Sequence, residues 1–201
     1  MKVIFLDVDG VLNGWNWKLE LLHNILKPIH PLHEKYRLWY IKHGDIHVSK
    51  VKRLAKICEQ NHAVCVMTST WRHAYFDKDC DVPDVVRLRK LFKKYNITCK
   101  ECTENLGDRS NEIRKWLDDH PNIWDYIILD DDRIKDFEGY QVYTRDIKDG
   151  RLIYDGLQNK HVKEAKIRFD WMQACHTVSY CNAFRIPIPK KIIRKFKGVL
   201  S

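Results

Sequence analysis

Three short apolar segments each run directly into a cluster of polar side chains, and this pattern constrains the fold more than any other feature of the sequence. Residues 2–6 (KVIFL) precede Asp7 and Asp9, residues 63–67 (AVCVM) precede Thr68-Ser69-Thr70, and residues 125–129 (DYIIL) precede Asp130-Asp131-Asp132. Short runs rich in β-branched residues are typical of buried strands. We therefore expect three strands that each end in polar residues.

The segments between these runs have the apolar spacing of helices. We expect helices over residues 48–61 and 84–95 and another that opens at Ser110, and further strands over 96–102 and 140–144. Alternating strands and helices favour an α/β fold in which helices cover a parallel sheet. Because the carboxyl ends of parallel strands converge on one crevice, the three polar clusters are expected to meet there.

Two regions stand apart from this alternation. Residues 14–47 are rich in Trp, Tyr and His and follow the first strand, so we expect a cap that lies over the crevice. Residues 166–201 carry eight Lys or Arg and one acid, Asp170, whereas residues 1–165 carry 28 basic and 26 acidic side chains. We thus expect a core at 1–165 and a basic extension at 166–201, where residues 190–200 have amphipathic helical spacing. We expect its apolar stripe to dock on the core, and its basic residues are a candidate for contact with nucleic acid.

Composition excludes several classes of protein. The chain has 201 residues, of which 44% are hydrophobic and 31% charged, with a net charge of +9. It is long enough for a stable core, and no apolar run reaches the roughly 18 residues of a membrane span. The apolar run at the N-terminus is too short for a signal peptide, so we expect a cytoplasmic protein with reduced cysteines. Cys99-x-x-Cys102 is more typical of buried thiols than of a zinc site.

The acidic clusters predict a magnesium site. Asp7, Asp9, Asp130 and Asp131 would bring four carboxylates together, which is unfavourable unless a cation neutralises them. Hard oxygen ligands in a compact site suit Mg²⁺. A carboxylate beside Mg²⁺ and a phosphate can act as a nucleophile, and a second carboxylate two residues away can protonate the leaving group.

The remaining polar residues suit phosphate binding. Thr68 offers a hydroxyl and Ser69 a backbone N–H directly after a strand, and Gly10 permits a sharp turn beside the acids. A cation is also needed to stabilise charge on the transferring phosphoryl group. The candidates are Arg72, Arg109 and Lys115.

Two other phosphate- or metal-related folds fit less well. The DVDG segment lacks the later acids of an EF-hand loop and follows a strand. A two-component receiver domain would have its acidic clusters in a different order along the chain.

The string FLDVDGVLN (5–13), together with MTSTWR (67–72) and IILDDD (127–132), resembles the motifs of the haloacid dehalogenase (HAD) superfamily. With RSNEIRKWL (109–117), the chain most resembles the HAD domain of bacterial "Swiss Army knife" RNA-repair proteins over roughly residues 1–160. The resemblance implies a Rossmann-like sheet with helices on both faces and Mg²⁺-dependent phosphatase chemistry.

The resemblance also implies roles for individual residues. Asp7 would be the nucleophile and a metal ligand, and Asp9 the general acid and base with its carbonyl on the metal. Thr68 and Arg109 would bind the phosphoryl group, and Asp130 and Asp131 would hold Mg²⁺. Gly10, Ser69, Arg72 and Lys115 are candidates for substrate binding. Lys115 is the alternative to Arg109, since an Arg and not a Lys occupies the basic position of the third motif and Lys115 lies further along the same helix.

These observations predict a phosphomonoesterase that acts through an aspartyl-phosphate, with a nucleotide or a nucleic-acid terminal phosphate as substrate. One alternative is a nucleic-acid-binding module on an inactive HAD scaffold, and another is a phosphatase for small metabolites.

Overall fold

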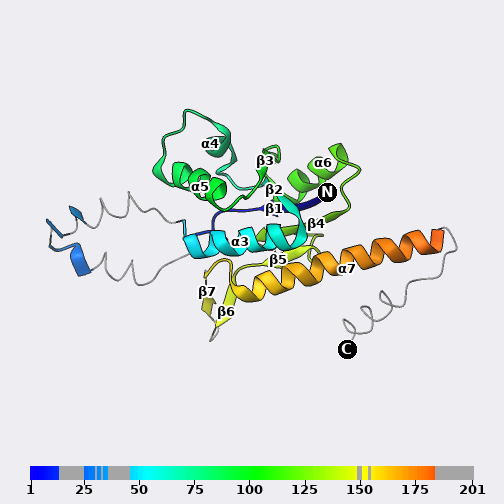
Figure 1. Cartoon of the computed structure of the whole chain (residues 1–201). Helices are drawn as coiled ribbons and strands as arrows, with labels where there is room; N and C mark the ends of the chain where they lie inside the picture. The colour runs from blue at the N-terminus through cyan, green and yellow to red at the C-terminus, as the bar shows by residue number, and fades with distance from the viewer. Residues whose placement is uncertain are drawn as a thin grey trace.

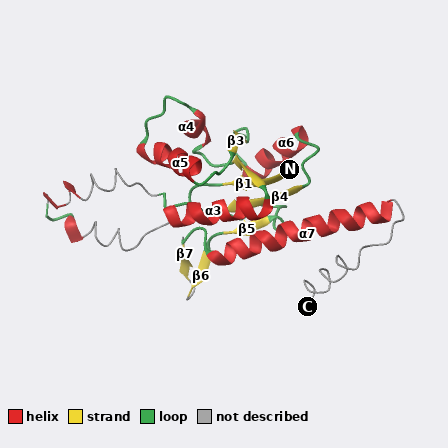
Figure 2. Cartoon of the chain, in the orientation of Figure 1, coloured by secondary structure: helices red, strands yellow, loops and turns green. Residues whose placement is uncertain are grey.

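The computed structural model describes residues 1–13, 25–29, 31–32, 34–35, 46–148, 151–153 and 155–183. Figure 1 shows a central sheet with helices packed around it, and Figure 2 distinguishes the two kinds of element. The expected cap at 14–47 and the expected amphipathic helix at 190–200 fall largely or wholly outside the described residues.

Five parallel strands form the sheet, in the order β3-β2-β1-β4-β5. They are β1 (Lys2–Leu6), β2 (Ala63–Met67), β3 (Cys99–Cys102), β4 (Asp125–Asp130) and β5 (Gln141–Tyr143). β1 occupies the centre, and its residues from Val3 to Leu6 are inaccessible to solvent. A parallel strand covered on both faces needs such a continuous apolar run, which is why this segment could be identified from sequence.

Helices cover the two faces of the sheet. Ile4 and Leu6 of β1 point to the face covered by α3 (Val48–Asn61), α5 (Pro83–Lys94) and α7 (Asn159–Ala183). Val3 and Phe5 point to the opposite face, where Ile113 and Trp116 of α6 (Arg109–Asp119) pack. The alternation of side chains along β1 therefore supplies two separate hydrophobic clusters.

The fold class expected from sequence, a Rossmann-like α/β sheet with helices on both faces, is confirmed. The structure adds a short helix α4 (Arg72–Phe76) and an antiparallel hairpin of β6 (Asp146–Lys148) and β7 (Arg151–Ile153). Helix α7 spans residue 165, and the boundary expected there between core and extension stays a prediction.

In the described part of the chain, every helix is too short or too polar to cross a lipid bilayer.

Candidate active site

The register of the sheet brings polar residues from three strand ends together. Leu6 of β1 lies opposite Met67 of β2 on one side and Leu129 of β4 on the other. The residues that follow are Asp7, Thr68 and Asp130. The ladder continues one step beyond the strands, since Asp7 N donates to Leu129 O (3.0 Å) and Thr68 N donates to Leu6 O (2.9 Å). All three side chains are thus fixed at the carboxyl edge of the sheet.

Three carboxylates meet at this edge. Asp7, Asp130 and Asp131 are buried, and each offers an oxygen that lies within 4.8 Å of the other two. Among the described residues this is the one group of three His, Cys, Asp or Glu side chains gathered so closely. The site is therefore formed by acids that are distant in sequence.

Gly10 allows the chain to turn tightly against this cluster. Its φ is +64°, and a Cβ atom at this position would lie 2.1 Å from Cγ of Asp131. Its N–H donates to Asn13 Oδ1 (2.7 Å), and its carbonyl accepts from the Thr144 hydroxyl (2.9 Å). Gly10 is required here both by its backbone conformation and by the close approach of Asp131.

Arg109 extends from the first residue of α6 into the acidic cluster. Its Nη1 donates to Asp7 Oδ1 (3.2 Å), Thr68 Oγ1 (3.0 Å) and Asp130 Oδ2 (2.9 Å). The start of α6 is set by Asp108, whose carboxylate accepts from the N–H of Asn111 (2.8 Å). One guanidinium therefore links the ends of all three strands.

Arg109 does not fully offset the negative charge of the cluster. Burial raises the pKa of Asp7, against the opposing effect of Arg109 and of a hydrogen bond from Ser69. Burial and repulsion from Asp7 raise the pKa of Asp130 to about 7, again against Arg109. Carboxylates in this state are better neutralised by a further cation, and three hard oxygen donors suit a divalent ion such as Mg²⁺.

Asp131 forms an ion pair with the guanidinium of Arg145. Arg145 Nη2 donates to Asp131 Oδ2 (2.8 Å) and lies 3.1 Å from Asp132 Oδ1. Sequence reasoning missed Arg145, although a basic residue directly after the strand at 140–144 was a signal that could have found it.

Asp9 is held by two donors. Trp71 Nε1 donates to Asp9 Oδ2 (2.9 Å), and Asn13 Nδ2 donates to Asp9 Oδ1 (2.7 Å). The carboxylate is exposed and its orientation is set by these donors. Trp71 also packs against the hydrophobic core, so this residue both fills space and positions an acid.

Arg72 and Lys115 were expected to contact substrate, but the structure directs both away from the acids. Arg72 is 3% exposed; its guanidinium forms two bonds with Glu112 (2.8 and 3.0 Å) and a third with Thr68 O (2.7 Å). Lys115 is half-exposed and pairs with Asp119 one turn along α6. The guanidinium of Arg72 is held inside the protein by its ion pair with buried Glu112. Lys115 lies on the solvent-exposed side of its helix.

The acids open into a cavity of about 200 Å³. Its lining includes Asp7, Arg109 and Asp130 together with Arg133 and Lys135, which follow the acidic cluster after β4. This space is large enough for a phosphoryl group and part of a ligand.

The C-x-x-C pair lies on β3, away from the acids. Cys99 and Cys102 are free thiols, and burial raises the pKa of Cys99 to about 12. Such a thiol stays protonated near neutral pH.

A five-stranded parallel sheet with this order, with acids after β1 and β4 and a hydroxyl after β2, defines a HAD-type α/β fold. The model of the family described as the HAD domain in Swiss Army Knife RNA repair proteins matches residues 3–148, and the chain belongs to that family. The resemblance seen in the motifs is thereby confirmed, and the match supports a phosphatase of the HAD type. No curated protein and no solved structure matches the chain.

Replacing Arg72 by Met should destabilise the protein by about 3 kcal/mol, because Glu112 would lose its main partner inside the protein. Urea unfolding measures the change, and exposed Lys115→Ala should leave stability nearly unchanged. If Arg72→Met raised KM for a phosphate ester and left stability intact, Arg72 would be a substrate contact after all.

Replacing Asp130 by Asn should stabilise the protein in EDTA near pH 8. The folded-state pKa of Asp130, about 7, lies above the unfolded value of 3.8, so the loss of stability builds up as pH rises between these two values and is complete above about 7. We expect a higher Tm, by roughly 2–4 °C for each kcal/mol gained. The gain should vanish near pH 4, where the native carboxyl is protonated; exposed Asp118→Asn should show neither effect. A lower Tm at pH 8 would contradict the electrostatic account.

Proposed function

We propose that this protein is a Mg²⁺-dependent phosphomonoesterase that acts through an aspartyl-phosphate on a nucleotide or nucleic-acid terminal phosphate. The observation that carries the proposal is the meeting of Asp7, Asp130 and Asp131 within 4.8 Å, with Arg109 bonded to Asp7 and Asp130. Two buried acids with raised pKa values are expensive to maintain, and such groups mark functional sites more often than structural ones.

Asp7, Asp130 and Asp131 are the residues that would hold the metal, and the family resemblance adds the backbone carbonyl of Asp9. When bound, Mg²⁺ would neutralise charge on the phosphoryl oxygens and on the surrounding carboxylates. Both carboxylate oxygens of Asp9 accept hydrogen bonds, from Trp71 and from Asn13. We therefore assign this side chain to proton transfer and not to metal binding.

Asp7 is the proposed nucleophile. One of its carboxylate oxygens attacks phosphorus, the bond from phosphorus to the ester oxygen breaks, and Asp9 gives its proton to that leaving oxygen. Water then attacks the phosphorus of the aspartyl-phosphate while Asp9 takes a proton from it. The bond between Asp7 and phosphorus breaks, and inorganic phosphate leaves with Asp7 restored.

Thr68 and Arg109 are the proposed phosphoryl-binding groups. The Thr68 hydroxyl and the Arg109 guanidinium lie 3.0 Å apart beside Asp7, so both donors face the group that Asp7 would attack. Ser69 lowers the pKa of Asp7, which favours the carboxylate form that a nucleophile needs. Donors held before substrate arrives stabilise the charge that develops in the transition state.

The substrate class rests on the family description and on the cavity. Arg133 and Lys135 line the cavity beside the acids, so phosphates next to the reacting one would find positive charge there. A cytoplasmic setting belongs to the same proposal and is consistent with seven free cysteines.

Asp7→Asn should lower the hydrolysis of an aryl phosphate by roughly 10³-fold or more, because the amide cannot attack phosphorus. Steady-state kinetics with Mg²⁺ measure the loss, and circular dichroism checks the fold. Asp118→Asn removes the same charge from the surface of α6 and should keep the wild-type rate. Wild-type turnover by Asp7→Asn would refute the nucleophile assignment.

A substrate panel tests the second half of the proposal. We expect kcat/KM to be highest for a mononucleotide or for an oligonucleotide with a 3′- or 5′-phosphate, since Arg133 and Lys135 can contact neighbouring charges. Arg133→Ala should reduce that preference while the rate with an aryl phosphate changes little. A higher kcat/KM for a sugar phosphate would leave the chemistry in place and overturn the substrate class.

A further inference from the structure

A strongly basic surface lies on the body of the protein, apart from the basic extension. Helices α3 and α5 cover the same face of the sheet and together carry nine Lys or Arg against two acids, Glu59 and Asp84. Residues 1–165 nearly balance in charge, so the acids that offset these cations lie elsewhere. The basic side chains are therefore concentrated on these two helices, relative to the average over residues 1–165.

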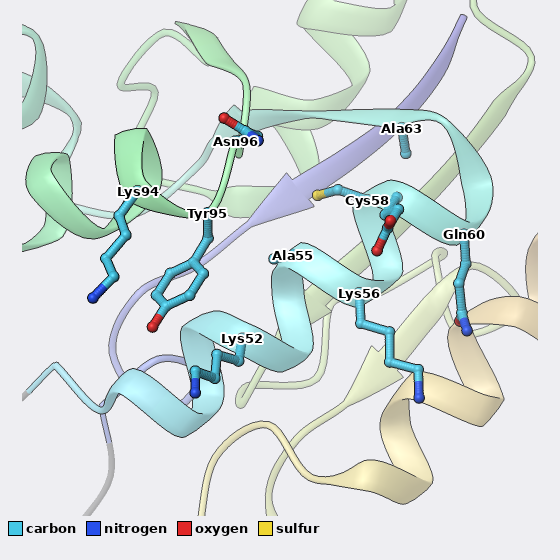
Figure 3. Close-up of a pocket in the computed structure, with 10 residues that line it drawn as sticks. Lys52, Ala55, Lys56, Cys58, Gln60, Ala63, Lys94, Tyr95 and Asn96 are labelled. Carbon is cyan, nitrogen blue, oxygen red and sulfur yellow. The ribbon is translucent and has the colours of Figure 1, made fainter.

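A cavity of about 680 Å³ opens between the two helices. Figure 3 shows Lys52 and Lys56 from α3 at its rim, with Lys94 and Tyr95 across from them at the end of α5. Ala63, the first residue of β2, also lines it, as does Glu59 of α3, so three lysines and one carboxylate surround the cavity. The cavity thus lies toward the amino ends of the strands, and β2 separates it from the acids by about 16 Å.

Tyr95 draws two of the lysines over this cavity. The ammonium of Lys52 lies 5.9 Å from the centroid of the Tyr95 ring, and that of Lys94 lies 5.7 Å from it. Cation–π attraction of this kind holds flexible lysine side chains near one another. It concentrates positive charge at the mouth of the cavity.

These lysines have no acidic partner within the described part of the chain. Lys52, Lys56 and Lys94 are exposed, and no ion pair joins any of them to a described carboxylate. Arginines of the same two helices differ, since Arg53, Arg87 and Arg89 donate to backbone carbonyls and so serve the fold. The lysines are the charges that remain available to a ligand.

We propose that this surface binds the phosphodiester backbone of a single-stranded nucleic acid. The cavity is larger than one phosphate, and the cations continue along both helices, which suits a ligand with repeated negative charges. A membrane fits less well, because none of the exposed large hydrophobic side chains of the described residues lies on α3 or α5. Binding here goes beyond the proposed catalysis and does not depend on it.

Fluorescence anisotropy with a labelled single-stranded RNA of about twelve nucleotides tests this surface. EDTA in the buffer prevents turnover, so failure of this proposal and failure of the phosphatase proposal are separate results. We expect the triple variant Lys52→Ala, Lys56→Ala, Lys94→Ala to raise Kd about tenfold. The slope of log K against log salt should become less steep by about 2, because three phosphate contacts are lost.

The matched control is Lys78→Ala, Lys100→Ala, Lys163→Ala, which removes the same net charge from exposed positions outside both helices. It should change Kd by less than about twofold, because distant charges are screened. Equal losses in the two triple variants would overturn the proposal, since they would show dependence on net charge alone. The proposal would also be overturned if the variant Lys52→Ala, Lys56→Ala, Lys94→Ala kept RNA binding and lost binding to phosphatidylserine vesicles, because the surface would then be a membrane-binding site. Unchanged aryl-phosphate hydrolysis by both variants would confirm that each is folded.

Discussion

The register of β1 against its two neighbours is the constraint on which the chemistry depends. Leu6 pairs with Met67 and with Leu129, and the next residue along each strand is polar and directed to the crevice. A slip of one residue would turn every side chain of β1 to the other face of the sheet. It would bury polar groups in a hydrophobic cluster and separate Asp7 from Asp130. The burial of Val3 to Leu6 therefore protects the geometry of the acids as well as the core.

The crevice is a compromise between stability and binding. Asp7 and Asp130 are almost inaccessible to water, and Arg109 offsets only part of their repulsion. Arg145 similarly offsets Asp131 from the other side. A protein selected for stability alone would replace one of these acids, and natural proteins keep such costs where function needs them. Gly10 belongs to the same compromise, because any side chain there would collide with Asp131.

The core of the fold was predictable from sequence because its signals are local. The run from Lys2 to Leu6 and the spacing within Val48–Asn61 each identify their element without reference to distant residues. Helix α7 was harder, because its apolar residues do not form a single stripe. Acids after strands predicted where the crevice lies, since parallel strands end at a common edge.

Side-chain partners were less predictable, because they depend on residues far apart in sequence. Arg72 is buried because it pairs with Glu112, forty positions away, and the residues near Arg72 in the sequence do not indicate this partner. Trp71 reaches Asp9 across sixty-two positions. The basic surface of α3 and α5 was missed for a related reason, because a charge count over residues 1–165 averages these two helices with more acidic segments.

Glu112 has a consequence for the edge of the crevice that Thr68 and Arg109 form. Its carboxylate holds Arg72, which in turn bonds the carbonyl of Thr68, and it lies 3.7 Å from Nε of Arg109. A single buried anion thus holds two cationic side chains: Arg72, which bonds the backbone of Thr68, and Arg109, which contacts the acids. Because this brace forms with folding, an arriving anion meets donors that are already immobilised. Little conformational entropy then has to be surrendered on association, and more of the contact energy remains to favour the bound state.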